Sequence, residues 1–177
     1  MPRTPGDVLI IGAGGHALVC IEVLRSAGAR VAGCVSSDGL AGADLAPMGV
    51  DMAGTTDDVG RLVAAGTTEL FVAVGDNDAR RRLTAAACAD GGRLVVAVSA
   101  DAVVSPTAAI GDGALVMPGA VVNAQASIGA GAIVNTNATV EHECRVGDFV
   151  HLAPRSVLAG RVVVGDGALV GVGACVA

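Results

Sequence analysis

Aromatic side chains are almost absent from this sequence. Its 177 residues include two Phe, no Trp and no Tyr, although 53% of the residues are hydrophobic. Most of these hydrophobic residues are Ala and Val, and 26 glycines accompany them. A core without large rings has to be filled by many small, regularly placed side chains. The composition therefore indicates a repetitive architecture.

Long apolar runs, paired cysteines and an excess of positive charge are also missing. No apolar run reaches the ~18 residues of a membrane span, and residues 1–7 lack the apolar stretch of a signal peptide. The five cysteines are scattered without a C-x-x-C motif, which predicts reduced cytosolic thiols. The net charge of -6 disfavours nucleic-acid binding, which depends on neutralising phosphates. We therefore expect a cytoplasmic protein with neither nucleic acid nor membrane as a partner.

A six-residue period runs through the second half of the chain. The aliphatic series is Val104, Ile110, Val116, Val122, Ile128, Val134, Val140, Val146, Leu152, Leu158, Val164, Val170 and Val176. A small residue stands four positions after most members of this series, as in Ala108, Ala114, Ala120, Ala126, Ala132, Ala138 and Cys144. Ordinary alternating strands would not hold a period of six for so long without slipping.

Such a period predicts a triangular prism in which three hexads make one coil. The aliphatic residue points into the prism, the small residue leaves room at the corner, and Gly or a small polar residue relieves the turn. Coils then stack with like residues over like. The pattern resembles the hexapeptide repeats of left-handed parallel β-helices, and the left-handed sense is taken from that resemblance.

The first part of the chain instead alternates between strand-like and helical segments. We expect strands at 8–11, 31–35 and 70–74, helices up to residue 26, at 57–65 and at 78–89, and a segment at 94–98 that leads into the coils. This alternation predicts a small parallel sheet flanked by helices, which is a Rossmann-like α/β domain. We place this domain at residues 1–99 and the β-helix at residues 100–177.

A glycine-rich motif follows the first expected strand. Residues 12–17 fit G-x-G-x-x-[GA] and open a helix, whose N-terminus attracts anions. A tight turn without a ligand is the alternative. The domain is too short for two mononucleotide halves, so a single nucleotide diphosphate fits better than a dinucleotide. The ligand is expected beyond the carboxyl ends of the strands, which carry Gly14, Gly15, His16, Ser36, Ser37, Asp38, Gly75, Asp76 and Asn77.

Three arginines follow at the start of the next expected helix. Arg80, Arg81 and Arg82 belong either to this crevice or to a solvated helix face.

Two of the three histidines lie in one stretch of the coils. His142 falls near a corner, where its side chain leaves the prism, and a neighbouring carboxylate, Glu143 or Glu141, can fix its tautomer. Such an imidazole suits a general base, although an exposed surface histidine remains the alternative. His151 should project from a flat face, as an interface, cofactor or structural residue. Two coil histidines are too few for a three-histidine metal site, so we expect no metal.

Three sequence stretches together resemble one family. The chain is similar to the NeuD/PglD-like hexapeptide acyltransferases, which are bacterial sialic-acid O-acetyltransferases and UDP-4-amino-sugar N-acetyltransferases. The likeness rests on residues 12–16, residues 74–77, and the coil residues Asn135, Thr136 and 140–144. It implies a homotrimer whose active sites lie between neighbouring β-helices.

The resemblance also implies a role for particular residues. His142 would be the catalytic base and Glu143 the carboxylate that raises its basicity. Contacts to the nucleotide-linked sugar would come from Gly14, Gly15, His16, Ser36, Ser37, Gly75 and Asp76, and His151 and Val172 would lie near acetyl-CoA.

This chain departs from the family in two respects. The family usually has paired acidic residues where this chain has Ser36 and Ser37, which bears on recognition of the nucleotide base. Its members also continue past the equivalent of Ala177, which indicates either an incomplete cofactor site or a truncated sequence.

We therefore expect an acetyltransferase that moves acetyl from acetyl-CoA to the amine of a nucleotide-linked amino sugar. The alternatives are O-acetylation of a sialic acid or another sugar hydroxyl, and a non-catalytic β-helix that forms trimers or binds nucleotide sugars.

Overall fold

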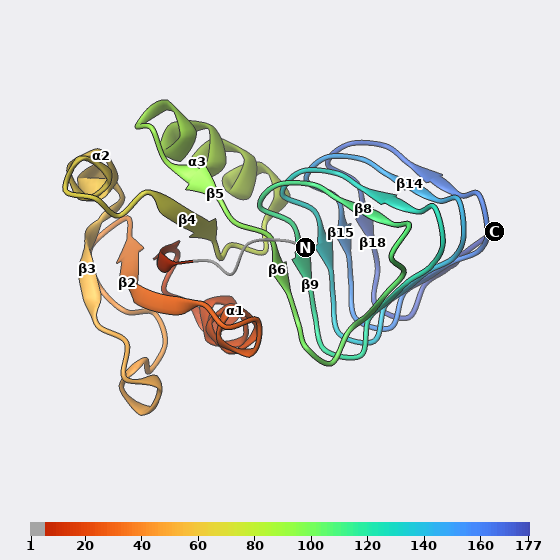
Figure 1. The fold of residues 1–177 in the computed structure, drawn as a ribbon, viewed down its shortest axis with the longest axis horizontal. Helices are drawn as coiled ribbons and strands as arrows, with labels where there is room; N and C mark the ends of the chain where they lie inside the picture. Colours follow the sequence, from red (N-terminus) through yellow and green to blue (C-terminus); the bar gives the residue numbers. More distant parts are fainter. Residues whose placement is uncertain (1–5) are drawn as a thin grey trace. The chain divides into compact units, whose positions relative to one another are not determined.

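The computed structural model describes residues 6–177, which divide into two compact units, the first ending at Val95 and the second running Val96–Ala177. The first unit is a parallel sheet with helices (Figure 1). Its elements are β1 (Asp7–Ile11), α1 (Gly15–Ser26), β2 (Arg30–Ser36), η1 (Ala46–Met48), β3 (Met52–Thr55), η2 (Thr56–Asp58), α2 (Val59–Ala64), β4 (Glu69–Val72), α3 (Asn77–Ala89) and β5 (Arg93–Leu94).

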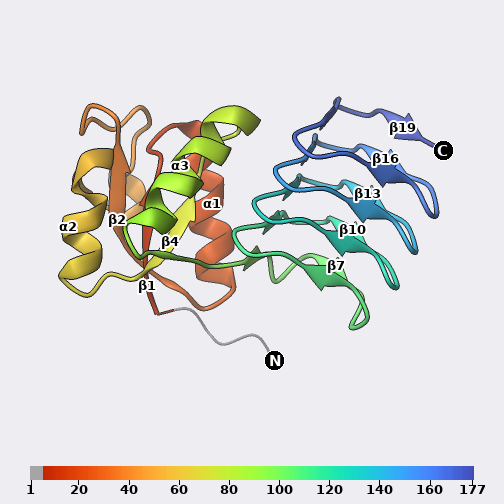
Figure 2. The ribbon, with the colours of Figure 1, turned by 90° about the horizontal axis from the view of Figure 1, so that it is seen from above.

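The sheet has the strand order β3-β2-β1-β4-β5, and all neighbours run parallel. Alternate residues of a strand face opposite sides. Leu9 and Ile11 therefore share one face, where they pack in a cluster with Val59 and Val63 of α2 and Ala87 of α3. Helix α1 lies on the other face (Figure 2). This is the predicted Rossmann-like arrangement, with every crossover made by a helix or a loop.

The second unit is a left-handed parallel β-helix made of two-residue strands on three faces (Figure 2). One face holds β7 (Val103–Val104), β10 (Val121–Val122), β13 (Thr139–Val140), β16 (Val157–Leu158) and β19 (Cys175–Val176). The second holds β8 (Ala109–Ile110), β11 (Ser127–Ile128), β14 (Arg145–Val146) and β17 (Val163–Val164). The third holds β6 (Ala97–Val98), β9 (Leu115–Val116), β12 (Ile133–Val134), β15 (His151–Leu152) and β18 (Leu169–Val170).

Each strand pairs with the strand one coil away, 18 residues along the chain. Val122, for example, is in register with Val104 and Val140. The predicted aliphatic positions fill the prism together with the predicted small ones, and from Ala114 to Leu158 nearly all of them are fully buried. The hexad pattern is therefore confirmed as the pattern of the core.

The boundary between the two units falls slightly before the predicted one. The segment expected at 94–98 is split, because its backbone changes partners within three residues. Val95 donates its N–H to Leu70 O (3.0 Å) in the sheet, whereas Ala97 donates to Ala114 O (2.9 Å) in the first coil. The coils thus begin at Val96, and β6, the first strand of the β-helix, lies within the range 1–99 that the sequence assigns to the first domain.

One hydroxyl interrupts the apolar prism. Ser156 takes a small inward position, is 1% exposed, and its Oγ has no hydrogen-bond partner among residues 6–177. Ala138 and Ala174 occupy the same place one coil away. Burying an unpaired hydroxyl costs about 1–3 kcal/mol.

Ser156→Ala is therefore expected to raise the free energy of unfolding by about 1 kcal/mol. Differential scanning calorimetry would record a higher Tm for this variant. Ser127→Ala, at an outward and partly exposed position, is the matched control and should leave the Tm unchanged. An unchanged Tm for Ser156→Ala would show that the hydroxyl is paired with water.

Candidate active site

The first candidate site lies at the carboxyl edge of the sheet, where β2, β1 and β4 are neighbours. Gly12 brings the ends of these strands together. Its N–H donates to Val35 O (2.8 Å), its φ is 118°, and a Cβ on it would lie 2.7 Å from Ala73 O. Only glycine fits this backbone conformation at this distance. The first glycine of the motif is thus required by the fold.

The later glycines of the motif are open to their surroundings. A Cβ added to Gly14 or Gly15 would meet no atom of the described residues within 4 Å. Gly14 is the N-cap of α1, and neither a capping side chain nor an acidic residue is present in the first turn of this helix. The positive end of the helix dipole therefore faces open space at Gly14 and Gly15, which favours an anionic ligand.

A serine–aspartate turn follows β2 at the same edge. The Ser36 hydroxyl lies 2.9 Å from Asp38 Oδ1 and 2.9 Å from Leu40 O, and Leu40 N donates to the same carboxylate (3.0 Å). Hydrogen bonds from the Leu40 backbone and from Ser36 lower the pKa of Asp38. Ser37 is exposed between them. The carboxylate of Asp38 and the exposed hydroxyl of Ser37 thus lie at the position where the resembling family usually has two acidic residues.

The loop after β4 lies at the same edge of the sheet. Asp76 is the N-cap of α3, and its carboxylate accepts a hydrogen bond from Ala79 N (2.8 Å). A Cβ added to Gly75 would meet nothing within 4 Å in the described residues. His16 is partly buried in the first turn of α1. The strand order therefore gathers all seven predicted substrate-binding residues at one edge of the sheet.

A second candidate site, in the other unit, is a corner of the β-helix. His142 follows β13 and points outward, with 53% of its side chain exposed. Its Nδ1 lies 3.0 Å from Glu143 Oε2. Arg161, one coil further on, donates from Nε to that same oxygen (3.0 Å). Of the two glutamates that flank the histidine, Glu143 is therefore the one in contact.

This contact settles the tautomer of the imidazole. A carboxylate oxygen only accepts hydrogen bonds, so Nδ1 of His142 carries a proton, and in the neutral ring Nε2 keeps its lone pair. The hydrogen bond from His142, with a smaller contribution from the charge of Arg161, lowers the pKa of Glu143. The carboxylate thus stays ionised and holds the ring in the form that accepts a proton at Nε2.

The backbone at this corner is left-handed, as it is at the other corners from Gly113 to Gly173. Glu143 and Arg161 occupy the left-handed region, with φ values of 60° and 66°, at a position where other corners carry glycine, such as Gly113 and Gly131. A non-glycine residue there costs of order 1 kcal/mol. Gln125, Asn137, Phe149 and Arg155 adopt the same conformation at equivalent positions, so this backbone belongs to the repeat and is not particular to the corner beside His142.

Gly160 leaves the space that the imidazole fills. It lies 18 residues after His142, and a Cβ on it would be 2.5 Å from Nε2 and 2.7 Å from Cε1 of that ring. Its φ lies outside the left-handed region, so its backbone conformation does not require glycine. The absence of a side chain at Gly160 therefore serves the position of the ring.

His151 lies on a flat face of the prism, as predicted, in β15. Its Nε2 is 2.9 Å from Asn135 Nδ2, whose amide oxygen accepts Thr136 N (2.8 Å). Since the Asn135 amide nitrogen is a donor, Nε2 of His151 is the acceptor of this hydrogen bond. Val172 is 75% exposed in the turn after β18. No three His, Cys, Asp or Glu side chains of residues 6–177 gather as metal ligands.

Comparisons with known proteins match both units. Residues 7–87 match the family model of the PglD N-terminal domain. A histidine-to-asparagine variant of perosamine N-acetyltransferase from Caulobacter crescentus, solved with CoA and GDP-perosamine, is 39% identical with a TM-score of 0.87, covering 97% of this chain and 89% of that one. The acetyltransferase domain of PglB from Neisseria gonorrhoeae is 36% identical with a TM-score of 0.84, covering 98% and 82%. Its complex with acetyl coenzyme A is 37% identical with a TM-score of 0.81, covering 96% and 80%.

This chain belongs to the PglD/NeuD-like hexapeptide acyltransferase family. The predicted family is thereby confirmed. Within this acyltransferase, sequence reasoning missed Gly160 and Arg161 as neighbours of His142 and Glu143. The signal was present, because both pairs are separated by the 18 residues of one coil, and stacked coils place such residues over each other.

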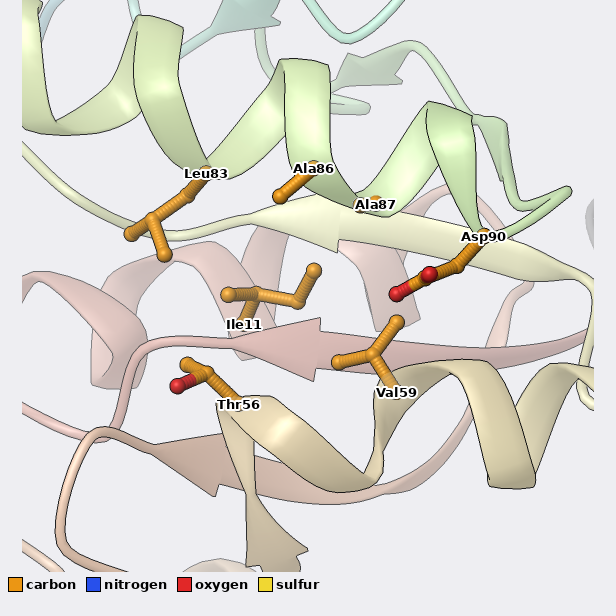
Figure 3. Close-up of a pocket in the computed structure, with 7 residues that line it drawn as sticks. All are labelled: Ile11, Thr56, Val59, Leu83, Ala86, Ala87 and Asp90. Atoms are coloured by element: carbon orange, nitrogen blue, oxygen red, sulfur yellow. The ribbon is translucent and has the colours of Figure 1, made fainter.

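A small pocket in the acyltransferase's first unit is lined by other residues. It lies between α2 and α3, lined by Ile11, Thr56, Val59, Leu83, Ala86, Ala87 and Asp90 (Figure 3). Its volume of about 30 Å³ has room for about two water molecules. It contains none of the predicted site residues. No helix in the described part of the chain is long and apolar enough to cross a bilayer.

Proposed function

We propose that this protein transfers the acetyl group of acetyl-CoA to the amine of a nucleotide-linked amino sugar, with His142 as the general base. The observation that carries this proposal is the pair formed by His142 Nδ1 and Glu143 Oε2 at 3.0 Å, which leaves Nε2 free to accept a proton. The Caulobacter relative supports it, since that enzyme was solved with CoA and GDP-perosamine in variants that replace one histidine.

The reaction needs one base and no covalent intermediate on the protein. The neutral sugar amine attacks the thioester carbonyl, and Nε2 of His142 takes the proton that the nitrogen loses. The tetrahedral intermediate then expels the sulfur of CoA, which receives the proton from the imidazolium. Glu143 stabilises the imidazolium while it exists, because its carboxylate is already hydrogen-bonded to Nδ1.

The first unit would bind the nucleotide-linked sugar. The open N-terminus of α1 at Gly14, Gly15 and His16 suits the diphosphate, since it offers N–H groups and partial positive charge. The loops that carry Ser36, Ser37, Gly75 and Asp76 lie at the same edge and would contact the rest of the nucleotide sugar.

The coils would bind acetyl-CoA and form a homotrimer. His151 and Val172 are the proposed contacts to the cofactor, and both side chains face outward from the prism. An outward stripe runs along the face formed by β7, β10, β13, β16 and β19. It consists of Val103, Val121, Thr139, Val157 and Cys175. Such a stripe suits packing against a second β-helix. We further propose a cytoplasmic location, where acetyl-CoA and reduced thiols occur together.

A thiol-release assay tests the proposal. The protein is mixed with acetyl-CoA and a panel of amino sugars linked to UDP or GDP, with a free sialic acid as the hydroxyl acceptor. We expect CoA release with at least one amino sugar, and mass spectrometry should find one added acetyl group on its nitrogen. Turnover with the sialic acid alone would instead identify an O-acetyltransferase. Failure to bind acetyl-CoA in a titration would identify a non-catalytic scaffold.

The two glutamates beside the base provide a matched pair. Glu143→Gln removes the negative charge that faces Nδ1 and stabilises the imidazolium, and it is expected to lower kcat by about 10- to 100-fold. Glu141→Gln changes the charge equally but leaves the contact at 3.0 Å intact, so its kcat should fall much less. Steady-state kinetics of both variants with the preferred amino sugar measures the difference. Equal losses would contradict the assignment of Glu143 as the partner of the base.

A further inference from the structure

Arg80 is the buried charged residue among residues 6–177, with 2% of its surface exposed. Burial lowers its pKa to about 10, so it remains a cation at neutral pH. The sequence allowed two positions for the three successive arginines, either in the ligand crevice or on a solvated helix face. Arg81 and Arg82 are exposed, as a solvated face requires, but Arg80 faces inward. Burying a charge is costly unless every donor is paired.

The partners of Arg80 come from one short loop. Its Nη1 donates to Val74 O (3.0 Å) and Gly75 O (2.9 Å), and its Nη2 donates to Asn77 Oδ1 (2.7 Å). The backbone N–H of Arg80 also donates to Asp76 O (2.9 Å). One side chain thus fixes the loop between β4 and α3 from the inside.

These contacts determine where the loop directs its N–H groups. In a trans peptide the C=O and the N–H of the next residue point in opposite directions, and no peptide bond in the described residues is cis. Because Val74 O and Gly75 O point at the buried guanidinium, the N–H bonds of Gly75 and Asp76 point away from it. Arg80 lies in the interior, so these two N–H bonds are directed outward.

The same loop borders the glycine motif. A Cβ on Gly12 would be 2.7 Å from Ala73 O and 3.2 Å from Val74 Cγ2, so the ends of β1 and β4 are in close contact. Space is open around Gly14, Gly15 and Gly75. The outward N–H bonds of Gly75 and Asp76 therefore share one edge of the sheet with the N-terminus of α1.

We infer that Arg80 is a positioning residue that aims the N–H groups of Gly75 and Asp76 at the diphosphate of the nucleotide-linked sugar. The inference rests on the proposed function and names how its substrate is held. An apolar side chain such as Met could fill the space but could not donate hydrogen bonds to the two successive carbonyls. The cation also polarises both peptide groups, which strengthens their N–H bonds as donors.

Calorimetric titration with UDP, GDP and the corresponding monophosphates tests this role. The measured quantity is the ratio of the Kd of the monophosphate to the Kd of the diphosphate, for whichever base the wild type binds more tightly. In Arg80→Met this ratio is expected to fall by about 10- to 100-fold, since bonds to charged groups are lost. Arg80→Lys, which keeps one cationic donor, should recover part of it. Arg82→Gln is the matched control on the same helix and should keep the wild-type ratio.

A merely structural role predicts a different result. A weakened fold would lower the Tm and the folded fraction but would leave the ratio unchanged, and an unchanged ratio in folded Arg80→Met would overturn the inference. If that variant does not fold, NMR of the wild type decides, because the amide resonances of Gly75 and Asp76 must shift with the diphosphate. If these resonances do not shift, the inference about Arg80 is overturned, whereas the proposed function is not. Absence of any nucleotide binding by the wild type would overturn the proposed function itself.

Discussion

Replacing His142 with alanine is expected to lower kcat by about 10²- to 10⁴-fold, the usual contribution of a general base. The imidazole is the proton acceptor at the corner of the β-helix, and its Nδ1 is held by Glu143 at 3.0 Å. Without it, the proton of the attacking amine has no acceptor of matched basicity. Proximity of the bound substrates would remain, so a residual rate above the uncatalysed one is expected.

The folded state should tolerate this change well. His142 has 53% of its side chain exposed and contributes nothing to the prism core, which consists of inward aliphatic residues such as Val140 and Val146. We expect the Tm, the oligomer mass and the affinity for acetyl-CoA to stay near wild-type values. Added imidazole should restore part of the activity of His142→Ala. A kcat within threefold of the wild type would refute the role of this residue as the base.

The period of the sequence was sufficient to predict the coils. Each inward position from Val116 to Leu158 lies where the hexads placed it, because a six-residue repeat can bury one aliphatic and one small side chain only at fixed points of a prism. The same frame turned His142 outward. The glycine motif was equally informative, since Gly12 approaches the backbone of the neighbouring strand end, as such motifs require.

The features that sequence reasoning missed depend on contacts between distant residues. β3 (Met52–Thr55) was not predicted, because its four half-buried residues include a glycine and show no clear alternation. The burial of Arg80 follows from carbonyl groups at the end of β4, and backbone acceptors leave no mark in a sequence. Arg161 and Gly160 follow from the stacking of one coil on the next, which the 18-residue spacing allows once the fold is known.

Substitution of Gly160 by alanine is expected to lower kcat by about 10²-fold, the effect of displacing a catalytic group by about 1 Å. The added Cβ would lie 2.5 Å from Nε2 of His142, well inside van der Waals contact. The ring would have to rotate away, which breaks its hydrogen bond to Glu143. Alanine suits the backbone of Gly160, whose φ is not in the left-handed region, so the Tm should be unchanged or slightly higher.

A second glycine and a double variant distinguish this effect from a general one. Gly165→Ala is the matched control, since its Cβ would meet nothing within 4 Å in the described residues and its kcat should match the wild type. If Gly160 acts through the imidazole, adding Gly160→Ala to His142→Ala should cause little further loss, because residues that act as a unit are not additive. A full additional 10²-fold loss in the double variant would mean that Gly160 acts on the substrates rather than on the base.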